Sequence, residues 1–214
     1  MTDNIKVLLV DDHTVVRAGF KLLLATSPAI DVIAEANCGE EAIQLYQSHL
    51  PDIVVLDLSM PGIGGLETIS RLVQRNKNIA ILVFSFHDEP VYVNRALNIG
   101  AKGYITKSSA PTILSEAIIS IHNGQNYIES GLLDSAQNQL PENNPEAIVQ
   151  KFSTREFDVF RLSAQGLTTH KIADELCLGY KTVANYITQI KKKLGTPTLI
   201  ELSHIATTLG IVKH

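Results

Sequence analysis

The sequence is poor in the residues that crosslink small secreted folds or build metal-bound ones. Its 214 residues include two cysteines, Cys38 and Cys177, which lie far apart and share no spacing typical of a metal site. The seven histidines are scattered, with no His-x-x-x-His pair. We therefore expect neither a disulfide framework nor a structural zinc site, and we interpret both cysteines as reduced thiols of a cytoplasmic protein.

Long apolar runs are missing as well. No segment approaches the roughly 18 to 20 apolar residues that a helix needs to span a bilayer. The first ten residues have neither the basic start nor the long apolar stretch of a secretory signal. The sequence therefore predicts a cytoplasmic protein without a membrane partner.

Charge is distributed unevenly along a chain whose length suits two domains better than one. Residues 1–144 carry 16 acidic and 9 basic side chains, a balance of −7. Residues 145–214 carry 9 basic and 6 acidic side chains, a balance of +3. A basic C-terminal part favours an anionic partner such as nucleic acid, although +3 also lies within ordinary variation.

The first 125 residues alternate between short apolar runs and segments of helical periodicity. The runs cover 5–10, 31–36, 53–56, 79–84 and 103–105, and they lack the polar alternation of half-exposed strands. Apolar stripes between them predict helices, the first with Val15, Val16, Phe20, Leu23 and Leu24. Five strand–helix units predict the α/β class, with a doubly wound, five-stranded parallel sheet in a domain of residues 1–125.

The rest of the chain predicts a linker and a small all-α domain. Residues 137–145 are polar and contain two prolines, and we assign 126–150 to the linker. In the domain 151–214 we expect four helices, at about 154–165, 169–176, 180–194 and 198–209. Ser153 and Glu156 have the spacing of a capping box, and Leu178-Gly179 predicts a tight turn.

Polar side chains follow four of the predicted strands. Asp11 and Asp12 follow the first, Asp57 the third, Ser85 the fourth and Lys107 the fifth. The carboxyl ends of parallel strands meet at one edge of a sheet, where ligands bind. Any one of these residues could be a turn or cap residue, but five such residues at four strand ends favour a site.

The predicted site has the chemistry of phosphoryl transfer. Three converging carboxylates repel one another unless a cation intervenes, and an all-oxygen site suits Mg²⁺. A carboxylate such as Asp57 can attack phosphorus and form an acyl phosphate. Mg²⁺ and the ammonium of Lys107 would neutralise the phosphoryl oxygens, and the hydroxyl of Ser85 could bind one of them.

Residues 5–123 resemble a receiver domain of the two-component family, which has a flavodoxin-like sheet of order 2-1-3-4-5. The motifs are LLVDDH at 8–13, VVLDLSMPG at 54–62 and GYITK at 103–107. The resemblance implies a phosphoacceptor, Asp57, with Lys107 and Ser85 as the other catalytic residues. It also implies a switch pair, Ser85 and Tyr104, and Mg²⁺ ligands from Asp11, Asp12, Asp57 and the backbone carbonyl of Ser59.

The same resemblance implies a protein that is no classical enzyme, because a receiver catalyses only its own Mg²⁺-dependent phosphotransfer and dephosphorylation. Its partner would be a sensor histidine kinase, such as a membrane-bound hybrid kinase. In this family Tyr104 would turn inward as Ser85 is drawn to the phosphoryl group.

Three residues depart from the usual receiver pattern. Ser108 follows Lys107, where many receivers have proline. Ser59 and His87 occupy two positions that in the family flank the path of the hydrolytic water. We therefore hypothesise that His87 alters the lifetime of the phosphorylated state, the alternative being a solvated loop side chain.

The predicted helix 180–194 is amphipathic, with lysines and amides opposite an apolar face. This pattern is typical of a helix that binds in the DNA major groove, and also of a solvated surface helix. Residues 152–209 are similar to the helix-turn-helix domain of NarL/FixJ (LuxR-type) regulators, through FSTRE at 152–156, AQGLTTHKIA at 164–173 and KTVANYI at 181–187. The resemblance implies double-stranded DNA as a partner, and a last helix that pairs two such domains. The implied DNA contacts are Thr168, Thr169, Lys171, Lys181, Ala184, Asn185, Thr188, Gln189 and Lys192.

Closer motifs point to the GacA/UvrY branch of this family: CGE at 38–40, SMPGIGGLE at 59–67, GQNYI at 124–128 and ELSHIA at 201–206. The implied protein is a transcriptional activator that forms a homodimer when phosphorylated or on DNA. Ala184 stands where many relatives have lysine, so the operator cannot be carried over from them.

Two alternatives stay open at this point. A phosphatase with an aspartyl-phosphate intermediate would share the acids and the lysine, but Ser59 stands where its second catalytic carboxylate belongs. An interaction module would keep the pocket without phosphorylation controlling DNA binding.

Overall fold

The computed structural model describes residues 4–109, 111–132 and 144–212. The chain divides into two compact units between Asp134 and Ser135, and each unit is described by itself. Among the described residues, no helix combines the length and the apolar character needed to cross a membrane.

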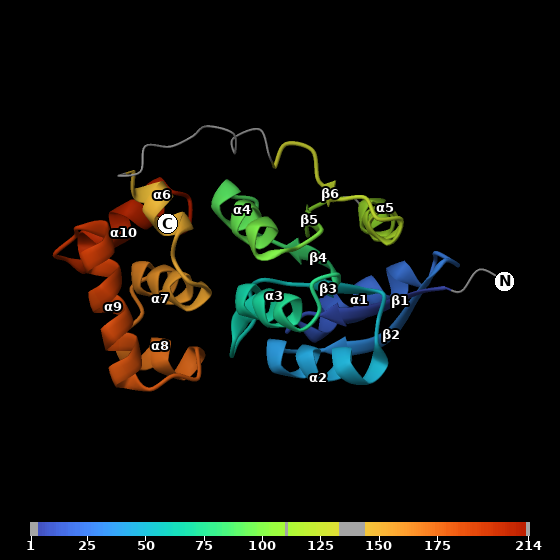
Figure 1. Ribbon diagram of the computed structural model, residues 1–214, viewed down its shortest axis with the longest axis horizontal. Coiled ribbons are helices and arrows are strands. Elements are labelled where there is room, and N and C mark those ends of the chain that lie inside the picture. Colours follow the sequence, from blue (N-terminus) through green and yellow to red (C-terminus); the bar gives the residue numbers. More distant parts are fainter. Residues whose placement is uncertain (1–3, 110, 133–143, 213–214) are drawn as a thin grey trace. The chain divides into compact units, whose positions relative to one another are not determined.

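The first unit is built on a parallel sheet of six strands (Figure 1). They are β1 (Ile5–Val10), β2 (Ile30–Ala36), β3 (Ile53–Leu56), β4 (Ala80–Ser85), β5 (Gly103–Thr106) and β6 (Tyr127–Ile128). The order β2-β1-β3-β4-β5-β6 confirms the predicted order of the first five. Every residue of β3 and β5 is buried, which explains why these runs lack polar alternation.

Helices cover both faces of this sheet. On one face, α1 (Thr14–Leu24) and α5 (Pro111–His122) pack over an apolar core that includes Val7, Leu9, Val55, Leu82 and Ile105. On the other face, α2 (Gly39–His49), α3 (Gly64–Arg75) and α4 (Pro90–Ile99) contact one another in series. The predicted doubly wound architecture is confirmed.

One residue of the predicted apolar stripe of α1 is not part of the core. Val15 is 86% exposed, whereas Leu24 at the other end of the helix is fully buried. Val15 lies in the first turn and lines an apolar hollow of about 300 Å³ with Phe20, Phe86 and others, so its side chain faces solvent. The stripe therefore predicted the helix, although Val15 at its start is exposed.

The second unit is all-helical. Its helices are α6 (Pro145–Gln150), α7 (Thr154–Ala164), α8 (Thr169–Glu175), α9 (Tyr180–Leu194) and α10 (Leu199–Thr208). The last four confirm the four predicted helices. The capping box of Ser153 and Glu156 is present at the start of α7, as predicted.

The turn between α8 and α9 lies slightly earlier than the predicted Leu178-Gly179 pair. The residue with positive φ is Cys177, at 52°, and it follows Leu176, the C-cap of α8. The N–H of Leu178 donates to the carbonyl of Ala173 at 2.8 Å and closes the helix end. Gly179 has extended backbone and serves as the N-cap of α9.

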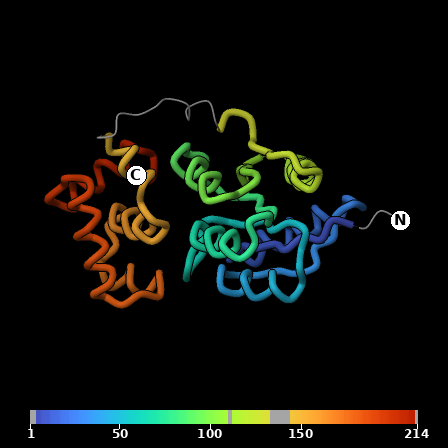
Figure 2. The backbone as a smooth tube through the Cα atoms, viewed as in Figure 1, coloured from blue at the N-terminus to red at the C-terminus, as the bar shows by residue number. Residues whose placement is uncertain are grey.

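The range 126–150, assigned to a linker, contains an ordered element at each end. After α5 the chain returns to the sheet as β6 (Figure 2). There Tyr127 pairs with Gly103 and Ile128 with Tyr104. A strand of two residues is too short to show a period. At the other end, Pro145 begins α6, because proline is favoured in the first turn of a helix. The residues from 133 to 143, which include most of the polar stretch, lie outside the described residues.

Candidate functional site

Three carboxylates meet at the C-terminal edge of the sheet, as the sequence predicts. Asp11 follows β1 and Asp57 follows β3, and each is only 2% exposed. Asp12 is half-buried beside them. One ligand atom from each of these acids and one from His13 all lie within 4.8 Å of one another.

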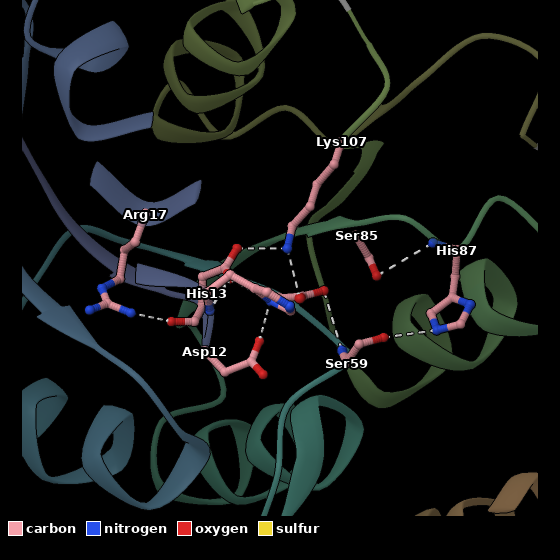
Figure 3. Close-up of polar contacts among 9 residues, drawn as sticks. Asp12, His13, Arg17, Ser59, Ser85, His87 and Lys107 are labelled. Atoms are coloured by element: carbon pink, nitrogen blue, oxygen red, sulfur yellow. Dashed lines mark hydrogen bonds and ion pairs between the residues drawn. The ribbon is translucent and has the colours of Figure 1, made fainter. Parts of the chain in front are cut away.

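Lys107 is the cation that reaches into this group of acids. Its Nζ lies 2.6 Å from Oδ2 of Asp11 and 2.7 Å from Oδ2 of Asp57, and its side chain is 1% exposed. Figure 3 shows the long side chain extending from the end of β5 into the pocket. Because one ammonium faces three carboxylates, the pocket keeps a net negative charge that favours a further cation.

Backbone groups orient the two buried acids. The N–H of His13 donates to Oδ1 of Asp11 at 2.9 Å, and the N–H of Ser59 donates to Oδ1 of Asp57 at 3.2 Å. Helix α3 begins close behind Asp57, where a Cβ on Gly65 would lie 2.4 Å from the Asp57 carbonyl oxygen. Only glycine allows this approach, so the sequence at the start of α3 helps to fix the position of Asp57.

The residues of the pocket fit Mg²⁺. Asp11, Asp12 and Asp57 offer the oxygen ligands that this ion prefers, and they form one cluster in which Asp11 and Asp57 are buried. The fourth predicted ligand, the carbonyl of Ser59, belongs to the loop directly after Asp57. The His13 ring, whose Nδ1 lies 2.8 Å from Asp12 Oδ1, is exposed and is a nitrogen donor that Mg²⁺ disfavours.

The two predicted switch residues are joined through one backbone segment. Ser85 ends β4 and is fully buried, and the N–H of His87 points to its Oγ at 3.5 Å. The Tyr104 hydroxyl donates to the carbonyl of His87 at 2.8 Å. Burial, followed by the charge of Glu89, raises the pKa of Tyr104 far above its ordinary value, so its hydroxyl stays protonated. Tyr104 already lies inward in this structure.

The side chain of His87 contacts two residues at the edge of the pocket. Its Nε2 lies 3.0 Å from Oγ of Ser59, and its ring stacks on Tyr92 with centroids 3.9 Å apart. The side chain is 24% exposed. The alternative of a freely solvated loop residue is therefore wrong, and His87 and Ser59 bridge two loops beside Asp57 (Figure 3).

Two residues near the pocket were not predicted. Phe86 is 64% exposed, and the Nζ of Lys107 lies 5.2 Å from its ring centroid. Phe86 directly follows the apolar strand β4, and this position in the sequence could have identified it as a residue near the pocket. Glu129 binds Thr106, the neighbour of Lys107, but no sequence pattern revealed the β6 pairing that brings Glu129 there.

The second unit carries the predicted DNA contacts on α8 and α9. Val183 and Ile190 on the opposite side of α9 are buried, so the helix faces outward with its polar side. Ala184 and Thr169 are half-buried. The other predicted contacts are all exposed: Thr168, Lys171, Lys181, Asn185, Thr188, Gln189 and Lys192.

Two of the predicted threonine contacts also stabilise their own helices. Thr168 is the N-cap of α8, and its Oγ1 accepts from the N–H of Lys171 at 3.4 Å. The Thr188 hydroxyl donates to the carbonyl of Ala184 at 2.9 Å. Thr188 therefore presents its methyl group and an oxygen lone pair to solvent, rather than a free donor.

The lysines at the end of α9 differ in the partners of their ammonium groups. Lys193 reaches back to α7, where its Nζ lies 2.6 Å from Oε1 of the buried Glu156. Burial raises the pKa of Glu156, but the hydrogen bonds from Lys193 and Ser153 outweigh it and hold that pKa below its ordinary value. Both Lys192 and Lys193 are exposed, but Lys193 has a buried carboxylate as its structural partner.

The family comparisons agree with this geometry. The model of the response regulator receiver domain matches residues 7–119, and that of bacterial regulatory proteins of the luxR family matches residues 150–206. The first match ends before β6 and covers the whole acidic pocket. The second covers α8 and α9.

Full-length relatives have the same arrangement. The chain is 39% identical over 209 residues to the transcriptional activator protein ExaE of Pseudomonas putida, with 97% of this chain and 98% of that protein covered. It is 35% identical over 208 residues to the response regulator UvrY of Escherichia coli, with 97% and 95% covered. A solved structure of the RcsB response regulator of Salmonella typhimurium, at 24% identity, a TM-score of 0.73 and coverage of 97% and 98%, shows the same fold. The chain therefore belongs to the two-component response regulators of the NarL/FixJ type, in the GacA/UvrY branch, and joins a receiver domain to a LuxR-type helix-turn-helix DNA-binding domain.

Proposed function

We propose that this response regulator is switched by phosphorylation of Asp57 and then activates transcription. The observation that carries the proposal is the buried position of Lys107 between Asp11 and Asp57, at 2.6 and 2.7 Å. A fixed positive charge beside Asp57, the acid that follows β3, supports its role as the phosphoacceptor. The partner is a sensor histidine kinase, such as a membrane-bound hybrid kinase, and the regulator acts in the cytoplasm.

The chemistry is an exchange of one bond to phosphorus for another. An Oδ atom of Asp57 attacks the phosphorus of a phosphohistidine, the P–N bond breaks, and the leaving imidazole keeps the electron pair and takes up a proton from solvent. Lys107 stabilises the negative oxygens around phosphorus. Mg²⁺, held by Asp11, Asp12, Asp57 and the Ser59 carbonyl, supplies further positive charge when bound.

The signal leaves the pocket through Ser85. Its hydroxyl binds a phosphoryl oxygen in this proposal, and a shift of Ser85 acts on the N–H of His87, which lies 3.5 Å from its Oγ. The carbonyl of His87 accepts a hydrogen bond from the hydroxyl of Tyr104, so both switch residues contact the same loop. Phosphorylation thereby changes the surface formed by β4, α4 and β5.

The output is DNA binding by a homodimer. Helix α9 enters the major groove, with the start of α8 against the phosphates, and α10 pairs two domains on adjacent half-sites. The name of the relative ExaE as a transcriptional activator supports activation. The proposed contacts are those of the sequence analysis: Thr168, Thr169, Lys171, Lys181, Ala184, Asn185, Thr188, Gln189 and Lys192.

The test uses the full chain with phosphoramidate and Mg²⁺. Intact mass and peptide mapping should place one phosphoryl group on Asp57 in the wild type and none in Asp57→Asn. Asp52→Asn is the matched control, because Asp52 lies exposed at the opposite end of β3 and binds the N–H of Lys6. Equal labelling of Asp57→Asn and wild type would overturn the proposal.

Light scattering and genome-wide DNA occupancy then test the output in the same proteins. We expect dimerisation or occupancy to rise with phosphorylation in the wild type and in Asp52→Asn, but not in Asp57→Asn. If Asp57→Asn binds DNA as well as the phosphorylated wild type, the chain is instead an interaction module that is not controlled at this site.

His87 sets the lifetime of the phosphorylated state in this proposal. The bridge from His87 to Ser59 stands beside Asp57 and limits the approach of water. We expect His87→Ala to shorten the lifetime of phospho-Asp57 by about threefold, a change of under 1 kcal/mol in the barrier. The decay of the phosphorylated mass in the presence of EDTA and of Mg²⁺ measures it, and an unchanged rate contradicts the hypothesis.

A further inference from the structure

The carboxylate of Glu129, the residue after β6, binds the loop that carries Lys107. Oε2 of Glu129 accepts hydrogen bonds from the N–H of Thr106 at 2.8 Å and from its Oγ1 at 3.1 Å. Oε1 accepts a further bond from the hydroxyl of Ser109. Both oxygens of Glu129 are thus bound to the residues on either side of Lys107.

The backbone of Glu129 is fixed by the sheet. Its N–H donates to the carbonyl of Tyr104 at 3.0 Å, which continues the pairing of Tyr127 with Gly103 and of Ile128 with Tyr104. The direction of its side chain is therefore set by the sheet pairing and not by a flexible loop. Because β6 pairs with β5, Glu129 lies beside β5. Because β6 has only two residues, no sequence pattern revealed this pairing.

The loop is also defined by hydroxyl and backbone contacts, including a hydrogen bond from the N–H of Ser109 to the carbonyl of Thr106 at 3.2 Å. Ser108 stands where many receivers have proline, so no ring restricts the backbone after Lys107. Instead, Oγ1 of Thr106 lies 2.9 Å from the Ser108 hydroxyl and 2.7 Å from that of Ser109. Two hydroxyls, those of Thr106 and Ser109, thus contact the Glu129 carboxylate, and the Ser108 hydroxyl joins them through Thr106. On the other side, the N–H of Lys107 donates to the carbonyl of Ser85 at 2.8 Å.

We propose that Glu129 is a positioning residue for Lys107, and this inference rests on the proposed function of the Asp57 pocket. Its carboxylate replaces the missing proline as the element that fixes the course of residues 106–109. Lys107 is thereby held so that its ammonium meets Asp11 and Asp57, the place where phosphoryl charge develops. Small displacements of a charge-stabilising group lower the rate strongly, because its effect depends on a fixed position.

The first test is the rate of phosphorylation by phosphoramidate and Mg²⁺ in the full chain. We expect Glu129→Ala to react about fivefold more slowly than wild type, and Glu129→Gln to recover part of the loss because its amide oxygen still accepts from the loop. Glu116→Ala removes an exposed carboxylate from α5 in the same domain and should react as wild type does. Equal rates for Glu129→Ala and wild type would overturn the inference.

A double-mutant cycle separates positioning from a general loss of stability. If Glu129 acts through Lys107, Glu129→Ala should add no further loss of rate in a Lys107→Ala background. The free energy of unfolding, measured on the same four proteins, shows whether each variant is folded. A fivefold loss that persists without Lys107 overturns the inference while leaving Asp57 as phosphoacceptor. If the wild type itself is not labelled on Asp57, the proposed function fails instead.

Discussion

Replacing Lys107 with alanine is expected to slow phosphorylation of Asp57 about 100-fold and, at the same time, to tighten Mg²⁺ binding. The ammonium stabilises phosphoryl charge, and loss of one such preorganised group costs roughly 100-fold or more in rate. The same ammonium lies 2.6 Å from Asp11 and 2.7 Å from Asp57, where it competes with a metal ion for the carboxylates. The two effects therefore have opposite signs.

The variant should also lose stability when Mg²⁺ is absent. The side chain of Lys107 is 1% exposed, and its removal leaves two buried carboxylates without their cation. Breaking such a buried pair costs about 3 kcal/mol. Added Mg²⁺ should restore more of the free energy of unfolding in Lys107→Ala than in wild type, because ligand binding stabilises only the folded state.

Urea denaturation with and without Mg²⁺, together with the phosphoramidate reaction, measures all three quantities. Lys77→Ala is the control, since Lys77 is exposed and lies just before β4, at the opposite end of the strands from the acids. Weaker Mg²⁺ binding in Lys107→Ala than in wild type would contradict the view that the lysine and the metal share the same carboxylates.

The pocket was predictable from sequence because its parts follow a simple rule of topology. Buried parallel strands show as short apolar runs, and the residues after them must meet at one edge of the sheet. Asp11, Asp57 and Lys107 are 46 and 50 positions apart along the chain, yet the strand order alone brings them together. The helices of the second unit were predictable for a similar reason, since period and capping residues mark their bounds.

The features that escaped prediction depend on contacts rather than on period. β6 has only two residues, and Glu129 matters because that strand places it beside Thr106. Val15 belongs to an apolar stripe, but the sheet does not cover the first turn of α1. Lys193 looks like its neighbours in a run of three lysines, and only the packing of α9 on α7 directs it to Glu156.

The difference between Lys193 and its neighbour Lys192 leads us to expect different effects on DNA binding. Lys192→Ala should weaken binding to DNA and lower the slope of log affinity against log salt by about 0.9, because one phosphate contact is lost. Its free energy of unfolding should stay within about 0.5 kcal/mol of wild type, as is usual for an exposed side chain. Lys193→Ala should leave the slope unchanged, because its ammonium is bound to Glu156.

Lys193→Ala should instead lower stability, by about 1 to 2 kcal/mol at pH 7. The lowered pKa of Glu156 fixes the sign of the pH dependence. Its stabilising effect is fully present above the ordinary value of 4.5 and is lost as the pH falls through the lowered value. The difference between Lys193→Ala and wild type should therefore shrink in acid.

Fluorescence anisotropy with a labelled duplex of about 30 base pairs, long enough for two half-sites, gives the salt slopes. Urea denaturation at pH 7 and in acid gives the stabilities. Equal salt slopes for Lys192→Ala and wild type, or a reduced slope for Lys193→Ala, would contradict the assignment of the outward face of α9 to DNA. Because the two substitutions remove the same charge from adjacent residues, net charge cannot explain a difference between them, and the orientation of each lysine in the folded domain must.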